Sequence, residues 1–120
     1  MTESYMSDSG LCRCHLTIRR HDVGVVVAVL GELDFVAAPE LARNLRDLIE
    51  DQGNDDVVMD LGGVTFIDSF GVRTLLQARS TLCERGGRFA IAEPSAAVRR
   101  ILEILGLDVE LDIRAGPADS

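Results

Sequence analysis

The hydrophobic residues of this chain repeatedly change their spacing, from the two-residue period of a strand to the longer period of a helix. Two strand-like segments come first, at 14–20 and 25–33, and the second is a nearly continuous β-branched run. Helix-like and strand-like segments then alternate as far as residue 113. Neighbouring parallel strands need such helical crossovers between them. The pattern therefore predicts an α/β fold.

Caps, glycine breaks and apolar stripes place the later elements. The expected helices are 38–54, a segment from the join near residue 69 to the glycine pair at 86–87, and 94–106. The expected strands after the first two are 55–61, which Gly62 and Gly63 break, then 88–93 and an edge-like strand at 107–113. The order β-β-α-β-α-β-α-β predicts a mixed β-sheet of about five strands with helices packed on it.

A chain of 120 residues is long enough for one domain and too short for two. We expect a polar N-terminal tail at 1–11, a single domain at 12–113 and a C-terminal tail at 114–120. The N-terminal stretch has no basic segment followed by an apolar core, and no stretch approaches the roughly 20 apolar residues that span a bilayer. The expected location is cytoplasmic, without membrane insertion.

The formal net charge is -8, and all 12 basic residues are arginines. This balance argues against direct binding of nucleic acid or anionic membranes and fits a protein partner with a basic surface. Cys12, Cys14 and Cys83 are odd in number and lack the spacing of a zinc site. We expect these cysteines to be reduced and buried and to act as small hydrophobic residues. We expect the protein to bind no metal and no cofactor.

The stretch TFIDSFGVRTLL, residues 65–76, changes from strand-like to helix-like at Asp68 and Ser69. The simplest interpretation is structural. Serine is a preferred N-cap residue that contributes about 1 kcal/mol, and Asp68 is the alternative cap. On spacing alone, capping is the favoured role for Ser69.

Catalytic roles for this serine have little support. A serine nucleophile needs a general base within reach and a G-x-S-x-G elbow, whereas His15 and His21 both belong to the first hairpin. An aspartyl-phosphate receiver needs an accessory lysine, which the chain lacks, and no Walker-type phosphate loop is present. We expect the protein not to be an enzyme.

A second acidic segment follows the central strand, where Glu32 and Asp34 precede the first helix. Ligand sites of α/β sheets gather beyond the carboxyl ends of the strands. The alternative is that Asp34 only starts the helix. If both loops lie at the same end of the sheet, Asp34, Asp68 and Ser69 form one acidic corner that carries a hydroxyl.

Three stretches make the sequence resemble the STAS domains, and among them the bacterial anti-anti-sigma factors (anti-sigma factor antagonists). They are GELDFVAAPEL, VVMDLGGVTFIDSFGVRTLL and RGGRFAIAEPSAAVRRILEILGL. The resemblance covers roughly residues 15–112, and the middle stretch is the most specific. In this family the serine or threonine after the aspartate accepts a phosphate, and it matches Ser69. The characteristic aspartate of the first stretch matches Asp34.

The resemblance implies a switch. The unmodified domain binds an anti-sigma factor, usually a serine kinase of the histidine-kinase-like ATPase fold, and so releases the sigma factor. Phosphorylation of Ser69 by that kinase ends the binding, and a serine phosphatase restores it. The N–H groups at the helix start are expected to accommodate the phosphate. The expected partner-binding residues are Glu32, Asp34, Asp68, Ser69, Phe70, Gly71, Val72 and Arg73.

One position departs from the family pattern, because Phe70 stands where many members have a second serine. This phenylalanine is expected to pack in the partner interface or under the helix start. A different function remains open from the same resemblance, namely a STAS subunit that regulates or supports a larger complex such as a lipid-transport ATPase. Co-purified partners would separate the two.

Overall fold

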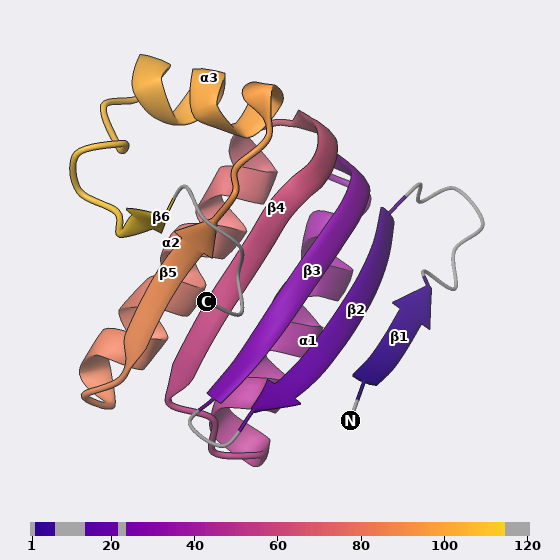
Figure 1. The fold of residues 1–120 in the computed structure, drawn as a ribbon, viewed down its shortest axis with the longest axis vertical. Coiled ribbons are helices and arrows are strands. Elements are labelled where there is room, and N and C mark those ends of the chain that lie inside the picture. Colours follow the sequence, from indigo (N-terminus) through magenta and orange to yellow (C-terminus); the bar gives the residue numbers. More distant parts are fainter. Residues whose placement is uncertain (1, 7–13, 22–23, 115–120) are drawn as a thin grey trace.

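The computed structural model describes residues 2–6, 14–21 and 24–114. These residues form one mixed sheet whose strands lie in their order along the chain (Figure 1). The strands are β1 (Thr2–Met6), β2 (Cys14–His21), β3 (Gly24–Leu33), β4 (Asp56–Ile67), β5 (Arg88–Ala92) and β6 (Ile113–Arg114). The helices are α1 (Ala38–Arg46), continued by the π-helical turn η1 (Asp47–Asp51), then α2 (Ser69–Glu84) and α3 (Ala96–Ile104).

The direction of the strands changes once across the sheet. Strands β1, β2 and β3 pair antiparallel, whereas β3, β4, β5 and β6 pair parallel. The predicted first hairpin and the predicted mixed α/β sheet are therefore confirmed. In Figure 1, α1 and α2 lie behind the sheet and α3 lies beyond the end of β4.

The core lies between the sheet and helices α1 and α2. Alternate residues of β2 and β4 point into it, including Ile18 and Met59, which are almost completely buried. Leu41 and Leu45 of α1 and Leu75 of α2 close the core from the helical side. The apolar stripe of the third predicted helix ends at Leu105, which is exposed after the end of α3.

Two differences from the expected strands occur in the first half of the chain. Residues 2–6, expected within a polar tail, form β1 and pair with β2. Gly62 and Gly63 do not break the third predicted strand, because β4 continues through them to Ile67. A Cβ at Gly63 would collide with the side chain of Leu30 on β3, so the glycine lets the two strands stay paired. The proposed domain boundaries remain predictions.

The predicted strand at 107–113 is largely wrong. Leu111 N and Glu110 N donate to the carbonyl oxygen of Leu107 at 3.0 and 3.1 Å, which are the hydrogen bonds of a turn. Val109 is 85% exposed, while Leu111 is buried. The alternating apolar residues therefore belong to a turn that buries only some of them, and only Ile113–Arg114 joins the sheet.

The cysteine prediction holds only in part. Cys14 is half-buried and packs against the core, whereas Cys83 is exposed near the end of α2. Cys83 lies on the outer face of that helix, which the sequence spacing did not reveal. Cys12 lies outside the described residues.

Candidate functional site

The two sequence segments singled out above meet at one edge of the sheet. Strands β3 and β4 are parallel, so the loops that follow them leave from the same end. The backbone N–H of Phe35 donates to Asp68 Oδ2 at 3.0 Å, and Asp68 N donates to the Leu33 carbonyl at 3.4 Å. The acidic corner expected from the sequence therefore exists.

Asp68 is the N-cap of α2. Its Oδ1 accepts hydrogen bonds from Phe70 N at 2.9 Å and from Gly71 N at 3.1 Å. Together with the bond from Phe35 N, this half-buried carboxylate binds backbone N–H groups of both loops. The capping role considered for Ser69 is thus wrong, and the alternative cap, Asp68, is correct.

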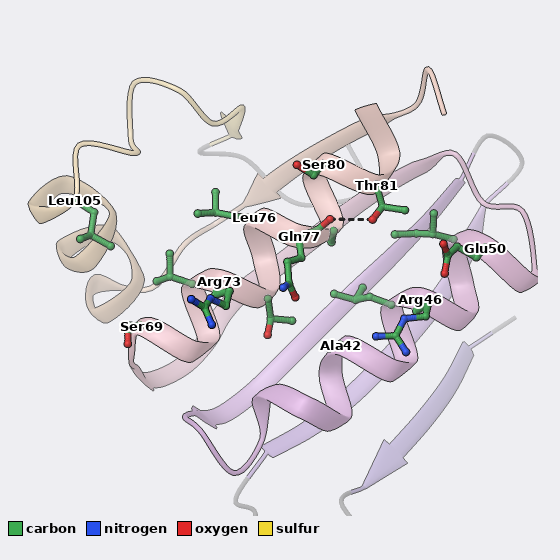
Figure 2. Close-up of a pocket in the computed structure, with 15 residues that line it drawn as sticks. Ala42, Arg46, Glu50, Ser69, Arg73, Leu76, Gln77, Ser80, Thr81 and Leu105 are labelled. Atoms are coloured by element: carbon green, nitrogen blue, oxygen red, sulfur yellow. Dashed lines mark hydrogen bonds between the residues drawn. The ribbon is translucent and has the colours of Figure 1, made fainter. Parts of the chain in front are cut away.

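Ser69 is the first residue of α2 and its side chain is exposed. Because Asp68 caps the helix, the Ser69 hydroxyl is not required for that purpose. The side chain stands at the beginning of α2 and lines a surface groove that runs along α2 and is bordered by α1 and Leu105 (Figure 2). The hydroxyl is therefore accessible from solvent without opening of the fold.

Gly71 allows the start of α2 to lie directly against β3. A Cβ added at this position would be 2.5 Å from the carbonyl oxygen of Leu33. The next residue, Val72, is 4% exposed and belongs to the core. Two of the expected partner-binding residues, Gly71 and Val72, therefore lie beneath the surface and support it.

Asp34 has a clear structural role. Its Oδ1 accepts hydrogen bonds from Val36 N and Ala37 N, both at 3.1 Å, and its carbonyl accepts one from Ala38 N. These bonds turn the chain from β3 into α1, which is the alternative considered for this residue. Its carboxylate is half-buried, as is Glu32 at the end of β3.

An exposed aromatic pair flanks the serine. Phe35 is 64% exposed and Phe70 is 54% exposed, and their ring centroids are 6.4 Å apart with an interplanar angle of 58°. Exposed apolar groups that cluster at one place commonly mark a protein interaction site. Phe35 is not among the residues expected from the sequence; its position next to Asp34, at the same strand end, was the available signal.

The groove beside Ser69 combines an apolar floor with charged walls. Arg73 stands one turn after Ser69 on α2, and Arg46 and Glu50 lie across the groove (Figure 2). Arg73 is exposed, and its expected contact with a partner remains a prediction. Gln77, Ser80 and Thr81 continue the polar wall along α2.

The described residues meet neither the requirements of a metal site nor those of a membrane-spanning helix. Within 2–6, 14–21 and 24–114, no group of three or more histidine, cysteine, aspartate or glutamate side chains is placed to hold a metal ion. Across the same residues, no helix combines the length and apolar character needed to cross a bilayer.

The sequence profile of the STAS domain matches residues 15–119. The chain belongs to the STAS domain family. A curated relative of this STAS domain, the anti-sigma-F factor antagonist RsfB of Mycobacterium tuberculosis, is 27% identical over 93 residues. That alignment covers 78% of this chain and 75% of RsfB.

Solved structures agree with this assignment. An anti-sigma factor antagonist from Mycobacterium paratuberculosis superposes with a TM-score of 0.78 at 29% identity, covering 88% of this chain and 89% of that one. The Bacillus cell fate determinant SpoIIAA in its phosphorylated form has a TM-score of 0.70 at 22% identity, covering 87% and 94% of the two chains, and shares the fold. The alternative of a subunit in a transport complex is not favoured by these relatives.

Proposed function

We propose that this STAS domain is an anti-sigma factor antagonist that binds an anti-sigma factor, releases the sigma factor and is switched off by phosphorylation of Ser69. The partner is a serine kinase of the histidine-kinase-like ATPase fold, and a serine phosphatase reverses the modification. The exchange takes place in the cytoplasm. The observation that carries the proposal is the exposed hydroxyl of Ser69 beside an exposed aromatic pair.

The proposed docking surface consists of Asp34, Phe35, Ser69, Phe70 and Arg73. Glu32 and Asp68 border it and are half-buried, and Asp68 ties the two loops together. Large aromatic side chains are the usual energetic centres of protein interfaces. Phe35 and Phe70 therefore supply the apolar contact, and the surrounding carboxylates select a partner with basic residues opposite them.

The switch follows from the charge of a phosphoserine. The phosphate adds about -1.5 to -2 charges at neutral pH. At about 6 Å and an effective dielectric constant near 20, repulsion between two unit charges is on the order of 2–3 kcal/mol before screening by salt. A partner that complements the unmodified surface would lose binding free energy by this repulsion. A loss of roughly 2.7 kcal/mol corresponds to about 100-fold in affinity.

Two of the N–H groups that the sequence suggests for the phosphate at the helix start already have an acceptor. The N–H groups of Phe70 and Gly71, which would bind an anion, already donate to Asp68 Oδ1. A phosphate on Ser69 would therefore remain on the surface, where a docked protein meets it. This supports control by local charge without a change of fold.

Phosphorylation by the anti-sigma kinase tests the proposal. Incubation with the kinase and ATP should add one phosphate, which intact-mass spectrometry detects. Ser69→Ala should remove this uptake, whereas Ser80→Ala should retain it, because Ser80 is another exposed serine on the same helix and groove. Modification that persists in Ser69→Ala would refute the site.

Binding measurements complete the test. In calorimetry with the kinase in the absence of ATP, Ser69→Ala should bind with the same affinity as the unsubstituted protein. Ser69→Glu should lose at least about tenfold in affinity, or 1.4 kcal/mol. Full affinity of the phosphorylated protein would contradict the switch even if Ser69 is the acceptor.

A further inference from the structure

Ser69 and Arg73 are neighbours on one face of α2. Residues at positions i and i+4 of a helix lie one turn apart, with Cβ atoms roughly 5–6 Å from each other. Both side chains are exposed and both line the surface groove along α2 that α1 and Leu105 border (Figure 2). The guanidinium of Arg73 can therefore reach a group attached to the Ser69 oxygen by rotation about its own side-chain bonds.

The groups around Ser69 leave few partners for an added phosphate. Asp68 uses Oδ1 to bind Phe70 N and Gly71 N, and its carbonyl oxygen accepts the N–H of Val72 at 3.1 Å. Its second oxygen, Oδ2, accepts from Phe35 N. A phosphate on Ser69 would thus meet an anionic carboxylate beside it, and its nearest source of positive charge along the helix is Arg73.

We propose that Arg73 is the internal receptor for the phosphate on Ser69, so that modification creates a phosphoserine–arginine pair across the first turn of α2. This inference rests on the proposed function, because it needs Ser69 to be the modified residue. Arginine suits the role because its planar guanidinium binds phosphate oxygens in a bidentate manner. The order also fits the helix, since an acidic group N-terminal to a basic one at i+4 is the favourable arrangement.

Arg46 is a weaker candidate for the same role. It stands on α1, across the groove, and Glu50 lines the same side (Figure 2). A phosphate that moved toward Arg46 would also approach the Glu50 carboxylate. Arg73 shares its helix with Ser69 and needs no change in the spacing of α1 and α2.

One modification would change the charge of the docking surface in two ways. Before phosphorylation, Arg73 presents an exposed positive charge to the partner. Afterwards, the phosphate brings negative charge and also engages the guanidinium. A partner carboxylate that contacted Arg73 would then lose its own counter-charge, which strengthens the discrimination between the two forms.

The test uses protein that carries phosphoserine at position 69, installed during translation, so that no kinase is needed. Phosphorus NMR then follows the second ionisation of the phosphate, whose ordinary pKa is about 6. A neighbouring guanidinium favours the dianion and lowers that pKa, whereas the carboxylates of Asp34 and Asp68 raise it in every variant. Relative to Arg73→Gln, the unsubstituted protein should show a phosphate pKa lower by roughly 0.5–1.

Arg88→Gln is the matched control. It removes the same charge from an exposed arginine at the start of β5, beyond the far end of α2. Since α2 has 16 residues, this position is separated from Ser69 by a helix about 24 Å long. Arg88→Gln should leave the phosphate pKa near that of the unsubstituted protein.

Two results would overturn the inference. One is an equal phosphate pKa in Arg73→Gln and the unsubstituted protein; the other is an equal rise in Arg73→Gln and Arg88→Gln, which would indicate only the loss of overall charge. Because the phosphate is installed without a kinase and no partner is present, these results do not depend on whether phosphorylation controls binding. A failure of the proposed function would appear in the kinase and affinity measurements instead.

Discussion

The chain turns from strand to helix at two comparable joins, and each places a serine near the start of the helix. At β5–α3, Ser95 is the N-cap, and its half-buried Oγ accepts the N–H of Val98 at 3.3 Å. At β4–α2, Asp68 is the cap and the serine follows it, exposed. The difference shows that a serine at a helix start is available for modification when another residue has taken over the cap.

The comparison extends to the third helical residue of each join. In α3 this residue is Val98, whose side chain is completely buried. In α2 it is Gly71, which lies against the Leu33 carbonyl with no room for a Cβ. The join that carries the candidate site is therefore packed through backbone atoms, and the other join is packed through a side chain.

The largest expected effect concerns the cap at the candidate site. Asp68→Ala removes the acceptor of three backbone N–H groups and should lower the free energy of unfolding by about 3 kcal/mol. Urea denaturation followed by circular dichroism measures this change. Asp68→Asn keeps one carbonyl acceptor and should lose about half as much. A loss under about 1 kcal/mol for the alanine variant would mean that the cap does not hold the two loops together.

The next effect tests the backbone packing at the same join. Gly71→Ala places a methyl group 2.5 Å from the Leu33 carbonyl oxygen, so α2 must shift, at a cost of about 2 kcal/mol in unfolding free energy. Chemical denaturation again gives the value. Because alanine is the better helix former, an unchanged or raised stability would show that the helix start moves freely away from β3.

A smaller effect is expected at the other cap. Ser95→Ala removes one hydrogen bond to Val98 N and should cost about 1 kcal/mol, less than Asp68→Ala. Ser95→Asp restores an acceptor and should recover the stability. If Ser95→Ala and Asp68→Ala cost the same, the two additional bonds that Asp68 accepts contribute nothing measurable.

The smallest effect is expected at the candidate site itself. Ser69 is exposed and makes no capping bond, so Ser69→Ala should change the unfolding free energy by less than about 0.5 kcal/mol. Thermal and urea unfolding of the purified variant provide the measurement. A loss near 1 kcal/mol would assign Ser69 a structural role like that of Ser95 and would weaken its assignment as a regulatory serine.

Much of the architecture was predictable because the periodicity of apolar residues reflects burial. The runs that contain Met59 and Leu41 were placed correctly as strand and helix, and the parallel crossover then brought Asp34 and Asp68 to one edge. This part of the site follows from topology alone. It required no knowledge of side-chain positions.

Two of the failures have a different cause, since they depend on contacts between distant segments. Asp68, which caps α2 in place of Ser69, also accepts a hydrogen bond from Phe35 N on another loop. The exposure of Phe35 depends on how that loop meets α2. The alternation at 107–113 looked the same for a strand and for the turn held by Leu107. Local spacing carries no information on such choices.

At the β4–α2 join, the residues that hold the fold differ from those that face outward, and this has an evolutionary consequence. Asp68 and Gly71 are tied to backbone atoms of the neighbouring loop and strand, so substitutions there endanger the whole fold. Phe70 and Arg73, between and after them, point outward and can vary at little structural cost. Duplicated genes that keep Asp68 and Gly71 but change Phe70 and Arg73 can therefore bind different partners in one cell, without cross-reaction and without a new fold.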